Sequence, residues 1–104
     1  MGYEQFRTKS LPQLQKHIRT TSGDSSSIVI LKHASVRMNQ RQISRLEVFE
    51  CLRKGVIRRV PEPDLKRGTL NCRMEHYLAG RDCMVIVALY DQRPDLIVVT
   101  VMTA

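Results

Sequence analysis

Three side chains suited to acid–base and phosphate chemistry recur at intervals of four residues in one short segment. His33, Arg37 and Arg41 would lie on neighbouring turns of one helix face. An imidazole can take up and return a proton, and guanidinium groups can hold a phosphate and stabilise the negative charge that grows on it. The set suits RNA cleavage by attack of the 2′-hydroxyl. The alternative is a solvated helix face that happens to begin with a histidine.

Further polar side chains fall in segments with strand patterns. Thr100 is the one hydroxyl within an apolar run, where it could contact a phosphate or only hydrogen-bond the backbone. Residues 70–78 alternate, which directs Arg73 and Tyr77 to one face of the expected strand. Tyr77 could stack on a base or donate a proton there. His76 falls on the other, apolar face, which predicts a buried histidine.

The positive charge is concentrated in the first two-thirds of the chain. The 104 residues have a net charge of +7, with +8 in residues 1–69 and −1 in residues 70–104. Arginine, which suits bidentate phosphate contacts, supplies most of it. This asymmetry predicts a polyanionic partner, RNA first, although a solubilising surface is the alternative. The candidate nucleic-acid contacts are Lys32, Arg45, Arg58, Arg59, Arg73 and Tyr77.

Metal and cofactor sites are not expected. Cys72 and His76 are four residues apart on one strand face, roughly 13 Å, which is too far for shared chelation. Phosphate-binding and dinucleotide-binding glycine patterns are missing as well. The other two cysteines, Cys51 and Cys83, also lie in apolar patterns, so the odd, scattered set predicts reduced, buried thiols.

Membrane association is not expected either. No run approaches the ~18 apolar residues that a membrane span requires. The polar N-terminal residues have no apolar signal-peptide core. We therefore expect a cytoplasmic protein.

Helical periodicity and capping residues predict three helices. The best specified begins at Ser44, which forms a capping box with Glu47, and it ends before Gly55. A polar, serine-rich connection over residues 20–27 predicts a flexible linker. We therefore divide the chain into an N-terminal helix with its linker (1–26) and a single α+β domain (27–104). The predicted helices are 10–20, 33–42 and 44–54.

Apolar runs separated by short turns predict the remaining β structure. The strand patterns cover residues 27–32, 56–60, 70–78, 83–89 and 96–102. Runs that are apolar on both faces are typical of central strands. The short turns favour a three- to four-stranded antiparallel sheet with the helices on one face. The fold class predicted is therefore α+β.

Over about residues 27–103 the sequence resembles a bacterial domain family of unknown function. The residues that carry the resemblance are Lys32-His33-Ala34, Arg37-Met38, Arg41, Ile43-Ser44, Gly55 and Ile97-Val98-Val99-Thr100-Val101. That family looks like RelE/ParE-type and barnase-like ribonuclease toxins, in which helices precede an antiparallel sheet. The resemblance implies a toxin-like ribonuclease with His33, Arg37, Arg41 and Thr100 as catalytic candidates. It also implies an antitoxin-like acidic protein as a partner.

Three classes of function therefore stay open. The first is a metal-independent endoribonuclease of the toxin type. The second is a non-catalytic module that binds nucleic acid or an acidic protein. The third is an interaction domain that forms a homodimer or larger oligomer through its apolar strands. Whether the chain is an enzyme is left open by the sequence.

Overall fold

The helix predicted from the Ser44 capping box is confirmed. In the computed structural model, which describes residues 3–91 and 93–103, helix α4 runs Arg45–Lys54. The Ser44 hydroxyl accepts a hydrogen bond from the Glu47 N–H at 3.1 Å, and the Glu47 carboxylate accepts one from the Ser44 N–H at 3.0 Å. The N–H of Gly55 closes the last turn on the carbonyl of Cys51, and a Cβ at Gly55 would collide with that carbonyl. The end of α4 therefore requires glycine.

The other two predicted helices are present, and a short additional one precedes them. Helix α2 (Leu11–Thr21) starts from a second capping box, between Ser10 and Gln13. Helix α3 (Lys32–Arg41) ends at Gln42, which adopts a left-handed conformation with φ of 54°. Helix α1 (Glu4–Arg7) is a single turn that the sequence pattern does not predict. A 3-10 turn (Ser25–Ser27) lies within the expected linker.

The sheet is larger than predicted, and it is mixed. Its strands are β1 (Ile28–Ile30), β2 (Val56–Ile57), β3 (Glu62–Asp64), β4 (Thr69–Leu78), β5 (Arg81–Tyr90) and β6 (Arg93–Thr103). The order is β1-β6-β5-β4-β2, and β3 also pairs with β4. The expectation of three or four antiparallel strands is wrong because β1 pairs in parallel with β6. A parallel pair needs a long connection, which α3 and α4 help to provide.

The central position predicted for the strand that is apolar on both faces is confirmed. Strand β5 lies between β4 and β6, and both of these neighbours are antiparallel to it. The strand predicted at 56–60 stops at Ile57. Pro63 lies in the edge strand β3, where its missing N–H is tolerated.

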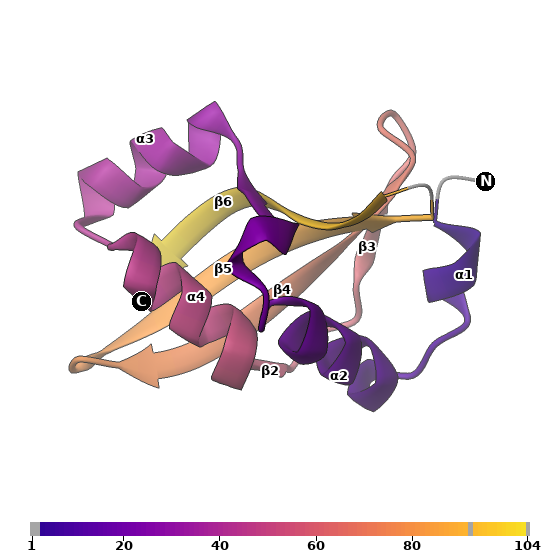
Figure 1. Ribbon diagram of the computed structural model, residues 1–104, viewed down its shortest axis with the longest axis horizontal. Coiled ribbons are helices and arrows are strands. Elements are labelled where there is room, and N and C mark those ends of the chain that lie inside the picture. The colour runs from indigo at the N-terminus through magenta and orange to yellow at the C-terminus, as the bar shows by residue number, and fades with distance from the viewer. Residues whose placement is uncertain (1–2, 92, 104) are drawn as a thin grey trace.

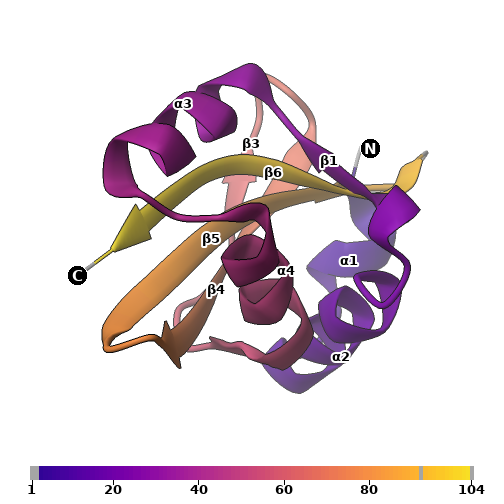
Figure 2. The ribbon, with the colours of Figure 1, turned by 60° about the vertical axis from the view of Figure 1, so that its left-hand side comes forward.

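Helices α2 and α4 cover one face of the sheet (Figures 1 and 2). Alternate residues of β4 and β5 point toward them and are fully buried, among them Met74, Val85 and Val87. The N-terminal residues Phe6 and Leu14 belong to the same core. Residues on both sides of the predicted boundary at residue 26 therefore share one core.

Helix α3 occupies the space beyond the short strand β1. The Leu31 N–H continues the strand by donating to the Val98 carbonyl at 3.2 Å, after which α3 begins. Ala34 and Met38 are buried, and the helix lies along β6 (Figure 2). The helix with the His33, Arg37 and Arg41 stripe is therefore held against the strand that carries Thr100.

The prediction of reduced, buried cysteines is confirmed. Cys51, Cys72 and Cys83 are all free and buried. Burial raises the pKa of Cys72 to about 12. The pKa of Cys51 is also raised, first by its hydrogen bond with Cys83 and then by burial. The thiols are part of the core beneath the helices.

Candidate nucleic-acid interface

The second face of the sheet is where most of the predicted polar strand residues gather. Asn71, Arg73, Glu75 and Tyr77 alternate with the buried residues of β4, so they point away from α2 and α4. The Glu75 and Arg73 side chains are 21% and 22% exposed, and Tyr77 is 68% exposed. This surface, which we call the open face, is partly accessible along its length.

Thr100 belongs to the open face as well. Arg73 on β4 stands opposite Ile86 on β5, and Ile86 stands opposite Thr100 on β6. The three residues therefore form one row across the sheet. Two residues that the sequence analysis singled out separately are thus aligned by strand register.

Two hollows border this row at the β4 edge of the sheet. One, of about 260 Å³, is lined by Arg59, Val60, Glu62, Asn71, Arg73, Ile86 and Met102. The other, of about 270 Å³, is lined by Arg58, Glu75, His76, Tyr77 and Asp82. Four of the six predicted nucleic-acid contacts, Arg58, Arg59, Arg73 and Tyr77, therefore line these two hollows.

The arginines around the hollows are only partly neutralised. Glu75 lies between two of them, with its carboxylate 3.3 Å from Arg73 Nε and 3.9 Å from Arg58 Nε. The Arg73 Nε is buried, yet no acceptor within the described chain has the geometry to bond it. Arg59 is exposed and makes no ion pair or hydrogen bond within that same part of the structure. Glu62 and Asp82 also line the hollows. The guanidinium of Arg59 is thus the positive group that remains available to an anionic ligand.

The exposure of His76 differs from the prediction of a buried histidine. It lies on the helix side of β4, as the alternation predicts, but its side chain is 23% exposed instead of buried. Its Nε2 is 3.9 Å from the Glu50 carboxylate. Because β4 lies near the edge of the sheet here, His76 reaches the same hollow as Tyr77.

The predicted catalytic stripe lies on α3, apart from these hollows. His33 is exposed, and the Arg37 guanidinium donates to the Gln40 side chain at 3.4 Å. None of the hollows described here is lined by His33, Arg37, Arg41 or Thr100. In residues 3–91 and 93–103, no hydrogen bond or ion pair links the stripe to Thr100. A shared catalytic role for the four residues stays a prediction.

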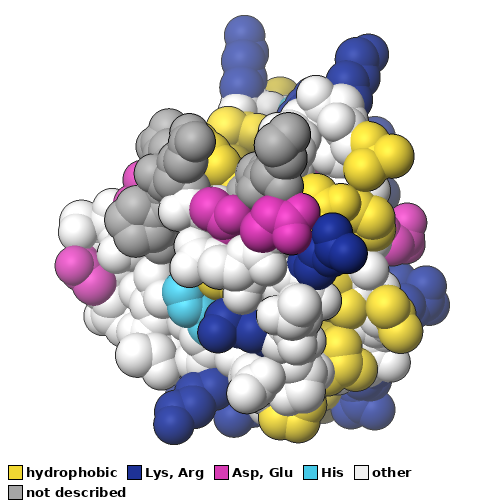
Figure 3. Space-filling model, turned by 90° about the vertical axis from the view of Figure 1, so that its right-hand side faces the viewer, with side chains coloured by type: hydrophobic (Ala, Val, Ile, Leu, Met, Phe, Trp, Pro, Cys, Tyr) yellow, Lys and Arg dark blue, Asp and Glu magenta, His cyan; other side chains and the backbone are white. Residues whose placement is uncertain are grey.

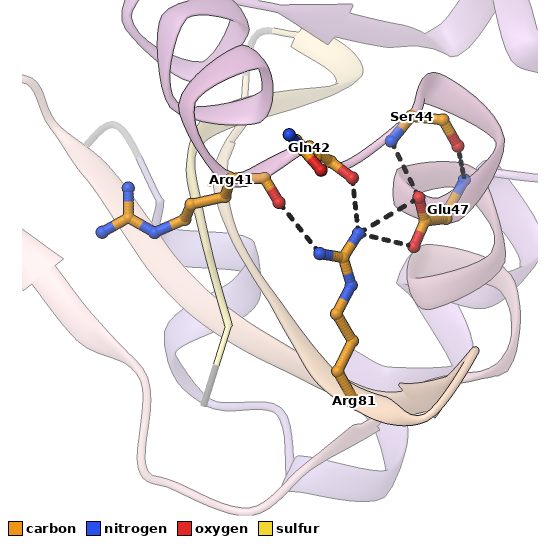
Figure 4. A network of polar contacts seen from close by, with 5 residues as sticks. All are labelled: Arg41, Gln42, Ser44, Glu47 and Arg81. Carbon is orange, nitrogen blue, oxygen red and sulfur yellow. Dashed lines mark hydrogen bonds and ion pairs between the residues drawn. The ribbon is translucent and has the colours of Figure 1, made fainter.

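The last residue of the stripe takes part in a structural network (Figure 4). The Arg81 guanidinium donates to the Arg41 carbonyl at 2.9 Å and also to the Gln42 carbonyl. It forms an ion pair with Glu47 at 3.1 Å. The Arg41 side chain extends away from this network (Figure 4). The β4–β5 turn is thus tied to the junction of α3 and α4, and the Arg41 guanidinium is left for other contacts.

The remaining candidates, Lys32 and Arg45, lie on the helices. Lys32 is the exposed first residue of α3. Arg45 begins α4, and its guanidinium lies 5.5 Å from the centre of the Phe49 ring, which Arg53 also approaches at 5.3 Å. Neither Lys32 nor Arg45 lines the hollows beside β4.

Two residues of the open face were missed by sequence reasoning, Asn71 and Glu75. The alternation of β4 already put both on the face of Arg73 and Tyr77. Their roles depend on Arg58 and Arg59, which reach β4 only because β2 pairs with Met74 and Glu75. No local pattern in the sequence carries that information.

The fold and this surface define a small basic α+β protein with helices on one face of a mixed sheet and an arginine-lined second face. The chain belongs to the family described as "Domain of unknown function (DUF4258)", whose model matches residues 30–103. No curated protein and no solved structure matches the chain. The match leaves α1 and α2 outside the family region.

Two further observations concern the described residues alone. None of their helices is both long and apolar enough to cross a membrane. Nor do three or more of their His, Cys, Asp or Glu side chains gather in a group that could hold a metal ion.

Proposed function

We propose that this protein binds single-stranded RNA across the open face of its sheet. The observation that carries the proposal is the gathering of Arg58, Arg59, Arg73 and Tyr77 around two hollows beside β4. Single-stranded RNA combines phosphates with unstacked bases, so it suits a surface of guanidinium groups and an accessible aromatic ring.

The phosphates of the RNA would bind the arginine side chains beside β4. The buried Nε of Arg73 makes no hydrogen bond within the described structure, although the Glu75 carboxylate lies 3.3 Å away, and a phosphate oxygen with better geometry would supply one. Arg59 is exposed at the rim of the same hollow. Three phosphate contacts on a single strand would give a salt dependence of log affinity with a slope of about −2.

A base would stack on Tyr77. Tyr77 is 68% exposed on β4, and it lines a hollow together with Arg58. Stacking on an aromatic side chain contributes about 1–3 kcal/mol per base and tolerates different sequences. The expected preference is therefore for unpaired RNA over duplex.

Fluorescence anisotropy with a labelled single-stranded oligoribonucleotide tests this proposal. Tyr77→Ala should weaken binding at least about fivefold, and Arg59→Ala should reduce the salt slope by about 0.7. Lys16→Ala is the matched control, because Lys16 is exposed on α2, away from the open face. Unchanged affinity in both open-face variants would rule out this surface.

RNA cleavage is a second candidate, and a separate observation favours it. Helix α3, with His33, Arg37 and Arg41, packs along β6, and β6 carries Thr100 on the open face. Together with the resemblance to RelE/ParE-type and barnase-like toxins, this supports a metal-independent endoribonuclease that acts on the RNA held there. An antitoxin-like acidic protein would then be its regulator.

Cleavage is tested by incubating RNA with saturating protein in the presence of EDTA. The expected result is chain cleavage that His33→Ala lowers at least about 100-fold. Ser35→Ala is the control, since Ser35 is an exposed neighbour on the same helix. RNA that stays intact would exclude cleavage while leaving RNA binding in place.

A further inference from the structure

A third surface lies between the N-terminal helices and the segment that precedes β3. It is an apolar groove of about 470 Å³, the largest of the hollows described here. Phe6, Leu14 and Leu70 line it from the core, and all three are almost completely buried. Val60 and Pro61 line it from the other side. This part of the molecule faces the viewer in Figure 3, where apolar side chains gather beside Lys and Arg.

The wall of the groove is unusually exposed for an apolar surface. Val60, which lines the groove beside Pro61, is 80% exposed. Contiguous apolar surface that is rimmed by polar residues commonly marks a site of protein association. The groove therefore has the character of a binding surface.

The charged residues that line the groove are all positive. They are Arg7 and Lys9, from α1 and from the connection to α2. Arg7 is paired with Glu4 at 3.2 Å. The Lys9 side chain makes no ion pair or hydrogen bond within the described residues. An occupant with acidic side chains beside its apolar ones would complement this arrangement.

We propose that the groove binds an amphipathic, acidic segment of a partner protein. Apolar side chains of the segment enter the groove, and carboxylates beside them pair with Lys9 and Arg7. A second copy of this chain fits poorly, because both copies carry a net charge of +7. Strand addition is also disfavoured, since Pro61 and Pro63 on the groove wall have no N–H to donate.

One side of the groove is formed by residues that lie outside the family region. Helix α1 and the start of α2 form one side of it, and the family match begins only at residue 30. Val60 lines both the groove and the hollow with Arg59, whereas Lys9 and Leu70 line the groove and neither lines the hollows beside β4, so Lys9 is the position that distinguishes the two surfaces. Partner binding and RNA binding can therefore be separated by mutation.

The test uses the full chain and three synthetic peptides of about 14 residues, labelled for anisotropy. The first has leucines at i, i+3, i+4 and i+7 and glutamates at its polar positions. The second has lysines in place of the glutamates, and the third has serines in place of the leucines. We expect the acidic leucine peptide to bind with a Kd below about 1 mM and the other two at least about tenfold more weakly.

Matched variants locate the binding on the protein. Lys9→Glu should weaken the acidic peptide at least about tenfold, whereas Lys16→Glu, the same charge change at an exposed site on α2, should not. Val60→Ser should also weaken it, whereas Leu46→Ser, at a side chain 75% exposed on α4, should not. RNA affinity measured in parallel should be unchanged in Lys9→Glu relative to Lys16→Glu.

Three results would overturn the proposal. One is equal binding of the acidic and basic peptides, or no binding of either. Another is loss of peptide binding in the control variants to the same degree as in the groove variants. The last is a concentration-dependent dimer, seen by sedimentation, that Val60→Ser dissociates, because the occupant would then be a second copy.

Discussion

The two faces of the sheet are made of alternating residues of the same strands, yet they meet different surroundings. On β5, Val85 points toward the helices and is completely buried, while its neighbour Ile86 points to the open face and is only partly buried. On β4, Met74 and Arg73 show the same contrast. One face is filled by the core beneath the helices, and the other is only partly covered. A strand with period-two alternation can contribute to both faces at once.

The largest expected effect is a difference between two adjacent substitutions on β5. Val85→Ala should lower the free energy of unfolding by about 2 kcal/mol, because it leaves a cavity in a closely packed core. Ile86→Ala should cost less, although it removes more atoms, since the open face is already accessible to water. Urea unfolding of the two variants measures both values. Equal losses would mean that the two faces are packed alike.

The next effect concerns the link between the helix-covered side and the β4–β5 turn. Arg81→Ala removes the hydrogen bonds to the carbonyls of Arg41 and Gln42 and the ion pair with Glu47. We expect a loss of about 1 kcal/mol in the free energy of unfolding, because these are hydrogen bonds of a charged group that is partly exposed to water. Arg59→Ala, at an exposed arginine without an ion pair or hydrogen bond in the described residues, should change it by less than about 0.5 kcal/mol. Similar losses in both would contradict a specific role for Arg81.

The smallest effect is a pH dependence that should come from the same network. The Ser44 N–H, and then the Arg81 guanidinium, lower the pKa of Glu47 below its ordinary value of 4.5. A carboxyl whose pKa is lowered by folding contributes stability above that ordinary value, and the contribution is lost as pH falls through the lowered pKa. Urea unfolding at neutral and at acidic pH should therefore show that acidification lowers the free energy of unfolding less in Glu47→Gln than in the wild type. If acidification lowered the free energy of unfolding equally in both proteins, Glu47 would not contribute to the pH dependence of stability.

Local patterns predicted the elements well, because the physics that forms them is local. Ser10 and Ser44 begin their helices through capping boxes that are readable in four residues. The alternation of β4 correctly put Arg73 and Tyr77 on one face. The fold class followed from such elements.

Features that depend on distant partners could not be read in the same way. The parallel pairing of β1 with β6 joins residues almost seventy positions apart, as in Ile28 with Leu96. The position of Arg58 beside Glu75 follows from the pairing of β2 at the sheet edge. The role of Arg81 depends on two carbonyls about forty residues away. In each case the decisive neighbour is set by tertiary packing.

An arginine of α2 and an arginine of α4 each donate hydrogen bonds to backbone carbonyls at the end of the other helix. Arg19 donates to the carbonyls of Gly55 and Lys54 at 2.9 and 3.0 Å, and Arg53 donates to the carbonyl of Ser22 at 2.7 Å. Each arginine satisfies backbone acceptors at the end of the other helix, where the helix itself provides no donors. The N-terminal segment, which precedes the family region, is thus hydrogen-bonded to the C-terminal end of α4. A protein that consisted of residues 30–103 alone would need another donor for the carbonyls of Lys54 and Gly55 and another cover for the buried side of α4.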